Sequence, residues 1–504
     1  MSEGPFLHGV ASGDPRSDRV ILWTRVTHDA DEPVDVRWTV ARDDGLHDVV
    51  ASGTARAEAE HDFTVKVDAG GLEPATTYHY AFEALNARSD VGRTRTLPQG
   101  PCEHVRFAQC SCAKYSAGYF NAYARIAERD DLDFVLHLGD YIYEYGNVDK
   151  APGPKIKRAM KPHEPCVTLE DYRTRYAHYR RDPVVRRVHA RHPFIATIDD
   201  HEVADNTWRD GAKHHDPEHD GDWHERKRAA LRAWHEWMPV RVDVVDGYPR
   251  INRRFSIGDL VDLFLLDDRS HRDAMANAPE PEAEDRTMLG KEQLEWLCDG
   301  LRSSRAAWRV VANGVMWGQV YTGLDEGEIG DALAEISVLT KKEHGPAPDQ
   351  WDGYPAERER LFALLRDEGV EDVVFVSGDV HSAWAMDLKS RADERDEHPV
   401  GVEFVTPSIT SENLDDHMHT DPRTVSIGVE RQIVEENPHI HWVELDSHGY
   451  VVVEVTRERA RASWWFVDEI WRPNDEERLE SIWEVRAGEH RLREVEPPDM
   501  GAHD

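Results

Sequence analysis

The sequence predicts an α/β protein in which a layered sheet domain follows a small β-sandwich. Three patterns predict this class: short alternating strands at the start, buried strands separated by amphipathic helices in the middle, and more strands near the end. A strand, a helix and a second strand in succession favour a parallel, right-handed crossover. At 504 residues the chain is also too long for one hydrophobic core, so more than one domain is expected.

Residues 1–98 are assigned to an N-terminal β-sandwich domain. Runs in which polar and apolar residues alternate are separated by turns rich in Gly, Pro and Asp, as is typical of sandwich strands. The stretch 72–78 is similar to the tyrosine-bearing corner of fibronectin-like modules. The runs are residues 19–26, 34–40, 63–67 and 77–82.

Residues 99–472 are assigned to the larger α/β domain. It starts with a strand at 105–111, a helix at 118–129 with one apolar face, and a second buried strand at 133–138. Further strands are expected at 194–198, 261–266, 309–312, 373–376 and 402–405, and helices at 223–237, 290–301 and 355–368.

The last part of the chain carries strand patterns and then a charged segment. Strands are expected at 442–445, 450–455 and 462–467, extending the second sheet rather than forming a new domain. Residues 473–504 are read as a charged C-terminal tail that packs on or near the larger domain.

The composition restricts the partners and the environment of the protein. The chain has 98 acidic and 61 basic residues, a net charge of −37. Such a surface repels phosphate backbones, so we expect no nucleic acid recognition. It suits a protein hydrated in high salt, which indicates a halophilic source; a very soluble extracellular enzyme is the alternative. No apolar stretch is long enough to span a membrane.

Five predicted strands end in groups that bind cations. In open α/β sheets, ligands collect beyond the carboxyl ends of the strands. A single acid there is usually a turn or helix cap, but several acids converging in one cleft repel one another unless cations neutralise them. The sequence therefore predicts a metal centre from the groups at Cys112, Asp140 with Tyr143, Asp199 with Asp200, Asp267 with Asp268, and Asp379 with His381.

These motifs resemble a known family. Gly139-Asp140-x-x-Tyr143, a later His-Glu pair and Gly378-x-x-His381 are similar to the calcineurin-like metallophosphoesterase pattern. The stretches 137–144, 199–203, 377–382, 8–14 and 22–25 resemble its alkaline phosphatase D (PhoD-like) branch. The resemblance implies a four-layer α/β/β/α metallophosphoesterase sandwich behind a fibronectin-like domain. It also implies an extracellular, periplasmic or cell-surface location, although the first residues of the chain do not resemble a signal peptide.

The resemblance also implies a role for each metal ligand. Asp140 corresponds to the residue that bridges two cations, Tyr143 to a phenolate ligand of ferric iron, and Cys112 to a thiolate on the same iron. Asp379 and His381 belong to the last metal motif of the pattern.

Two departures from the wider superfamily point to the second metal. Asp200 stands where an asparagine is usual, and Asp379 where a histidine is usual, so hard charged oxygen replaces neutral or nitrogen ligands. Calcium prefers six to eight oxygen ligands. We therefore expect Fe³⁺ with one or two Ca²⁺, in preference to Zn²⁺, Mn²⁺ or Mg²⁺. Asp199 and Asn206 are further candidate ligands, and a helix-cap role for Asn206 is equally open.

The expected reaction is hydrolysis of phosphomonoesters, with additional phosphodiesterase activity, by in-line attack of a metal-bound hydroxide. His201 is the candidate general acid, held by Glu202 or Asp199, and Asp140 is the second catalytic residue. Alternatively, His201 only forms hydrogen bonds to the metal ligands and takes no part in catalysis. The competing functions are a phospholipase D-like enzyme acting on phospholipid or nucleotide diesters, and a non-catalytic calcium-stabilised surface protein.

Overall fold

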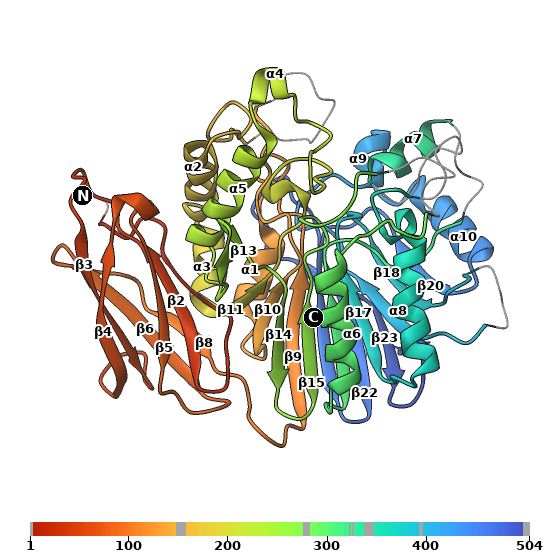
Figure 1. The fold of residues 1–504 in the computed structure, drawn as a ribbon, viewed down its shortest axis with the longest axis horizontal. Coiled ribbons are helices and arrows are strands. Elements are labelled where there is room, and N and C mark those ends of the chain that lie inside the picture. Colours follow the sequence, from red (N-terminus) through yellow and green to blue (C-terminus); the bar gives the residue numbers. More distant parts are fainter. Residues whose placement is uncertain are drawn as a thin grey trace, which may run out of the picture.

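A computed structural model describes residues 4–147, 158–275, 283–321, 324, 327–336, 347–392 and 397–496. The described strands form three sheets, of ten, seven and five strands, and one two-stranded ribbon. Helices cover the two larger sheets (Figure 1). The prediction of a mixed α/β fold with an N-terminal domain is confirmed.

The ten-stranded sheet is built around parallel strands from the middle and the start of the chain. β9, β10, β11 and β1 lie side by side and parallel, and the remaining pairs are antiparallel. Its order is β24 (Arg493–Glu494), β23 (Glu477–Arg486), β22 (Arg459–Val467), β21 (Gly449–Thr456), β9 (His104–Cys110), β10 (Phe134–His137), β11 (Pro193–Ala196), β1 (Val10–Gly13), β2 (Arg19–Arg25) and β5 (Thr64–Gly70).

The seven-stranded sheet has a parallel centre of β15, β16, β17 and β19. Its order is β14 (Arg253–Ile257), β15 (Val261–Leu265), β16 (Trp308–Ala312), β17 (Val373–Ser377), β19 (Gly401–Val405), β18 (Ala383–Leu388) and β20 (Ile440–Glu444). The two-stranded ribbon pairs β12 (Val244–Val245) with β13 (Tyr248–Pro249).

The N-terminal strands divide between two sheets. The five-stranded sheet consists of β4 (Val49–Ala57), β3 (Val34–Ala41), β6 (Thr77–Ala84), β7 (Ala87–Arg88) and β8 (Gly92–Arg95). In contrast, β1, β2 and β5 continue the ten-stranded sheet, because β1 pairs in parallel with β11. The start of the chain is thus joined to the larger domain through backbone hydrogen bonds.

Helices begin where the sequence offers capping groups. The Thr168 side chain accepts from the Asp171 backbone in a capping box at α2, and Asp222 caps α5. The helices are α1 (Asn121–Glu128), α2 (Leu169–Arg180), α3 (Pro183–Arg191), α4 (Pro217–Asp220), α5 (Trp223–Trp237), α6 (Lys291–Ser303), α7 (Gly327–Glu335), α8 (Pro355–Asp367), α9 (Leu414–Met418) and α10 (Ser426–Glu436). Short 3₁₀ turns lie at η1 (Ala59–His61), η2 (Asp200–Glu202) and η4 (Trp351–Gly353).

Three large buried clusters hold the sheets and helices together. Alternate residues of one strand point to opposite faces, so in β10 Phe134 and Leu136 join one cluster and Val135 another. The cluster of Phe134 also contains Leu263 and Leu265 from β15 of the seven-stranded sheet, and thus packs the two sheets against each other. The other two clusters bury the helices against the outer faces of the sheets.

The end of the chain corrects one prediction. β20 joins the seven-stranded sheet as expected, whereas β21 and β22 extend the ten-stranded sheet, because β21 pairs antiparallel with β9. The charged segment also contains the ten-residue strand β23, paired with β22. Residues 497–504 of the expected tail lie outside the described residues.

Within the described ranges, no helix is both long enough and apolar enough to cross a membrane.

Candidate metal centre

Four of the five predicted strand-end groups meet at one edge of the two parallel strand sets; Asp267 and Asp268 belong to no candidate metal group among the described residues, and Asp268 instead accepts from Asn313 and from the Val315 backbone. Cys112 follows β9, Asp140 follows β10, and Asp199 and Asp200 follow β11. Asp379, with His381, follows β17 of the facing sheet. Parallel strands bring their carboxyl ends to the same edge, which explains why residues far apart in the sequence converge.

The backbone at these strand ends is strained. Cys112, Asp140, Asp379 and His381 have φ values of 59°, 57°, 63° and 47°, in the left-handed region that side chains other than glycine rarely adopt. Such conformations persist where the surrounding structure enforces them, and they cluster at functional sites. The turns direct the four side chains into a common space.

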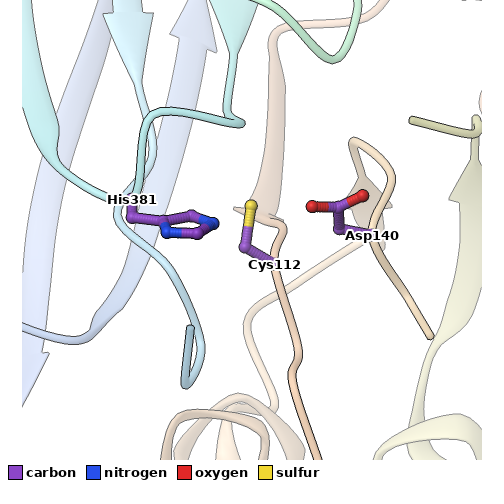
Figure 2. A group of neighbouring side chains, drawn as sticks. All are labelled: Cys112, Asp140 and His381. Carbon is purple, nitrogen blue, oxygen red and sulfur yellow. The ribbon is translucent and has the colours of Figure 1, made fainter. Parts of the chain in front are cut away.

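Asp140 is shared by three groups of residues that could hold a metal ion. In each group the potential ligand atoms lie within 4.8 Å of one another. Figure 2 shows the first group, with the Cys112 sulfur between the His381 ring and the Asp140 carboxylate. The groups are Cys112, Asp140 and His381; Asp140, Asp200 and His201; and Asp140, Asp199, Asp200 and Asp379.

Tyr143 completes the thiol side of the centre. Its hydroxyl donates to Asp140 Oδ2 at 2.9 Å and lies 3.3 Å from His381 Nε2, while Ser411 Oγ donates to it at 2.6 Å. Burial, together with nearby Asp140, raises the pKa of the Cys112 thiol and of the Tyr143 phenol. A buried phenol and thiol beside a carboxylate become anionic ligands only if a cation compensates their charge.

On the opposite side, three carboxylates surround a buried arginine that is not among the predicted site residues. Arg269 is fully buried, forms an ion pair with Asp199, and bonds to Asp379 Oδ1 at 3.1 Å and to Asp349 at 2.9 Å. Even so, Asp199 Oδ2 and Asp200 Oδ1 are buried without a hydrogen-bond partner. The sequence signal for Arg269 was its position directly after the strand-end pair Asp267-Asp268.

The pKa shifts of these acids indicate that one arginine does not neutralise them. Burial raises the pKa of Asp140 and Asp199 well above the ordinary range, and neighbouring carboxylates contribute. Burial also raises the pKa of Asp379 to about 7, although Arg269 opposes the shift. Partnerless carboxylate oxygens among mutually repelling acids fit a site for cations, which would stabilise all of them in the ionised form.

His201 is held by a carboxylate other than those expected. Its Nδ1 lies 2.7 Å from Glu144 Oε2, so neither Glu202 nor Asp199 orients the ring. Burial lowers the pKa of His201, but Asp200, Glu144 and Asp140 outweigh burial and raise it well above its ordinary value. Glu144 ends the motif at 137–144, so that motif was the available signal.

Glu202 has a different task. Its carboxylate accepts the backbone N–H groups of Asp199 at 2.7 Å, Asp140 at 2.9 Å and Tyr141 at 2.7 Å. It therefore ties the loops after β10 and β11 to each other beside the candidate ligands.

Asn206 reaches the centre through its backbone. Its N–H donates to Asp200 Oδ2, and its φ is 52°. No helix in the described part of the chain begins at Asn206, so the helix-cap alternative is wrong. Its role as a metal ligand stays a prediction.

The fold and this site together define a class of protein. A solved structure described as "Structure of PhoD" aligns with a TM-score of 0.86 and 33% identity, covering 99% of this chain and 93% of that chain. The alkaline phosphatase D of Bacillus subtilis (strain 168) is 36% identical over 487 residues, 92% of this chain and 78% of the relative. The protein is a phosphoric ester hydrolase.

Family models agree with this class. The model of the PhoD-like phosphatases matches residues 107–464, and that of their N-terminal domain matches residues 1–98. The chain belongs to the PhoD-like phosphatase family. A non-catalytic calcium-stabilised surface protein is thereby set aside.

Proposed function

We propose that the protein is a metal-dependent alkaline phosphatase that hydrolyses phosphomonoesters and has phosphodiesterase activity. The observation that carries the proposal is the position of Asp140, which is common to all three candidate ligand groups. A shared carboxylate suits neighbouring cations that act on one phosphoryl group.

The donor atoms favour two kinds of ion. Cys112, Tyr143, His381 and Asp140 offer sulfur, phenol, imidazole and carboxylate, a set that we assign to Fe³⁺. The remaining ligands, with shared Asp140, offer mainly carboxylate oxygen, which suits one or two Ca²⁺ better than Zn²⁺, Mn²⁺ or Mg²⁺. These ligands are Asp199, Asp200, Asp379 and Asn206.

When bound, such ions would supply an acidified water and positive charge for the phosphoryl oxygens. The chain's own contribution is the proton of His201. Glu144 holds Nδ1 and leaves Nε2 available to protonate the departing alcohol. Arg269 holds Asp199 and Asp379 in place, so the carboxylates are oriented before substrate binds.

Rates on three substrates test the activity. We expect the fastest hydrolysis for 4-nitrophenyl phosphate, slower hydrolysis for bis(4-nitrophenyl) phosphate, and little for phosphatidylcholine. A preference for phosphatidylcholine would instead establish the phospholipase D-like alternative, and failure on all three would refute both proposals.

The Cys112→Ala variant tests the iron assignment. Elemental analysis of the wild type should find iron and calcium, and a ferric phenolate–thiolate site should give a visible absorption band that this variant loses or shifts. Cys110→Ala is the matched control, because Cys110 is also a free, buried thiol but belongs to none of the three groups. An identical spectrum in all three proteins would exclude thiolate ligation.

We also propose the finer organisation implied by the family resemblance. A helix–sheet–sheet–helix order is supported by the three buried clusters, and a fibronectin-like class for residues 1–98 by the five-stranded sheet. Residues 99–472 would form the catalytic domain, with 473–504 packed on it through β23. The acidic composition supports an extracellular or periplasmic enzyme from a halophilic source.

A further inference from the structure

Arg180 carries an unpaired charge inside the protein. It is the last residue of α2, and its relative exposure is 0%. Its Nε, Nη1 and Nη2 atoms all lack a hydrogen-bond partner. No carboxylate among the described residues lies within ion-pair distance of it. Other buried arginines differ: Arg269 and Arg272 both bind Asp349.

The groups around Arg180 do not supply a negative charge. The guanidinium carbon lies 4.3 Å from the centre of the Trp23 ring. The Tyr141 hydroxyl also contacts the guanidinium, which works against the burial that raises the pKa of this phenol, but it is a neutral group and lies 2.9 Å from His189 Nε2. Burial lowers the pKa of His8 to about 2, and the positive charges of Arg25 and Arg180 lower it further. The side chains in direct contact with Arg180 are therefore neutral, and a nearby carboxylate, that of Asp182, pairs with Arg158 instead.

Two favourable contacts compensate the buried charge only in part. The face of Trp23 attracts the guanidinium, and the carboxyl end of α2 places partial negative charge near its last residue. Neither contact satisfies the N–H donors. Transferring an ion from water to the protein interior without a counter-charge costs more free energy than such contacts provide. Buried charges in proteins are therefore usually paired.

We propose that Arg180 holds a small monovalent anion, chloride, in the interior of the protein. The Nδ1 atoms of His8 and His189 are also buried without a partner, and either ring could supply a further donor as a neutral imidazole. The anion would lie between helices α2 and α3 and the strands β1 and β2. Since α3 packs against β1, the anion would fasten the N-terminal strands to the helices of the larger domain.

Diffraction from bromide-soaked crystals of the whole enzyme locates the ion directly. Bromide replaces chloride and scatters anomalously, so we expect an anomalous peak within hydrogen-bond distance of the Arg180 guanidinium. A peak only elsewhere, or a water or an oxyanion at Arg180 instead, would overturn the proposal.

Thermal unfolding tests whether the ion stabilises the protein. At equal ionic strength, the wild-type melting temperature should rise by on the order of a few degrees when chloride replaces gluconate, because chloride binds only the folded state. Arg180→Met should remove this difference. Arg187→Met is the control, because it removes the same charge from a side chain that is 47% exposed, and it should retain the difference.

Equal melting temperatures of the wild type in chloride and gluconate would contradict a stabilising chloride. If Arg180→Met does not fold, the wild-type comparison and the bromide map still decide the question.

Discussion

At the scale of single residues, Asp140 carries the largest share of the proposed chemistry. Its Oδ2 accepts from Tyr143 and its Oδ1 from the His201 backbone, so one carboxylate touches both sides of the centre. Replacing it removes one charge from a site where several acids already repel one another.

We expect Asp140→Asn to lose metal and activity together. An amide retains the shape but not the charge that holds a cation, so hydrolysis should fall by at least about 10²-fold. Elemental analysis and the rate on 4-nitrophenyl phosphate measure the two effects. Asp131→Asn is the control, since Asp131 is 46% exposed and pairs with Arg106. A variant with full activity would refute the shared-ligand role.

Glu144→Gln should slow the reaction while the metal content stays unchanged. The amide no longer stabilises a protonated His201, so the expected loss of kcat is about 10-fold to 100-fold. The loss should be larger for an alkyl phosphate than for 4-nitrophenyl phosphate, because a poor leaving group depends more on the general acid. Glu128→Gln, at a half-exposed site on α1, is the control. Equal losses on both substrates would show that Glu144 does not act through His201.

At the scale of elements, the turns after the parallel strands decide the geometry of the centre. Gly139, between β10 and Asp140, has a φ of +106°, and a Cβ there would lie 2.4 Å from the Asp199 backbone nitrogen. The loops after β10 and β11 can therefore approach each other only if this position is glycine.

Gly139→Ala should destabilise the protein by more than about 1 kcal/mol, because steric overlap adds to the cost of the left-handed backbone. Gly71→Ala separates the two causes, since Gly71 has a φ of +79° but open space around its Cβ position. Urea unfolding measures both variants. An equal loss in the two proteins would mean that the contact with Asp199 relaxes freely.

The elements also show which sequence patterns were informative. The expected helix at 223–237 is α5 (Trp223–Trp237), and the buried strands at 261–266 and 373–376 are β15 and β17. β23 was missed because its start, residues 477–481, carries three charged residues at exposed or half-exposed positions and resembles a tail. β21 was assigned to the wrong sheet because both sheets contribute to one apolar cluster, so its valines do not specify a partner.

At the scale of the whole molecule, buried histidines should make stability depend on pH. Burial lowers the pKa of His137 to about 3 and that of His192 to about 4, below the unfolded value of about 6.5. The folded state then binds fewer protons than the unfolded state. Stability is complete above about pH 6.5, and each histidine removes about 1.4 kcal/mol per pH unit as the pH falls toward its folded pKa.

The variant His137→Gln should therefore unfold with a shallower dependence on pH between about pH 7 and about pH 5. Its stability at neutral pH will be lower, because the contact of His137 Nε2 with the Tyr123 hydroxyl at 2.7 Å changes. The slope, measured by urea unfolding, is the relevant quantity. His47→Gln, whose side chain is 88% exposed, should keep the wild-type slope. A wild-type slope in His137→Gln would contradict a buried neutral His137.

The net charge of −37 should make stability depend on salt. Salt screens repulsion between surface acids, so the melting temperature in sodium gluconate should rise with ionic strength from about 0.01 M to about 1 M. Because gluconate is used, this effect is separate from that of chloride at Arg180. A falling melting temperature would show that attractive surface pairs outweigh the repulsion.

The candidate metal ligands, and the sheet edge at which they converge, were predictable from the sequence alone. Periodicity located the strands, and carboxyl ends of parallel strands share an edge, so Cys112, Asp140, Asp200 and Asp379 were predictable as a group. The side chains that hold these candidate ligands in place became apparent only from the packing of the folded chain. Glu144 holds His201, and Arg269 joins acids from both sheets, because such contacts depend on how side chains from distant segments pack. Local sequence patterns contain no information about those distances. For the same reason, the unpaired charge of Arg180 is apparent only in the folded structure.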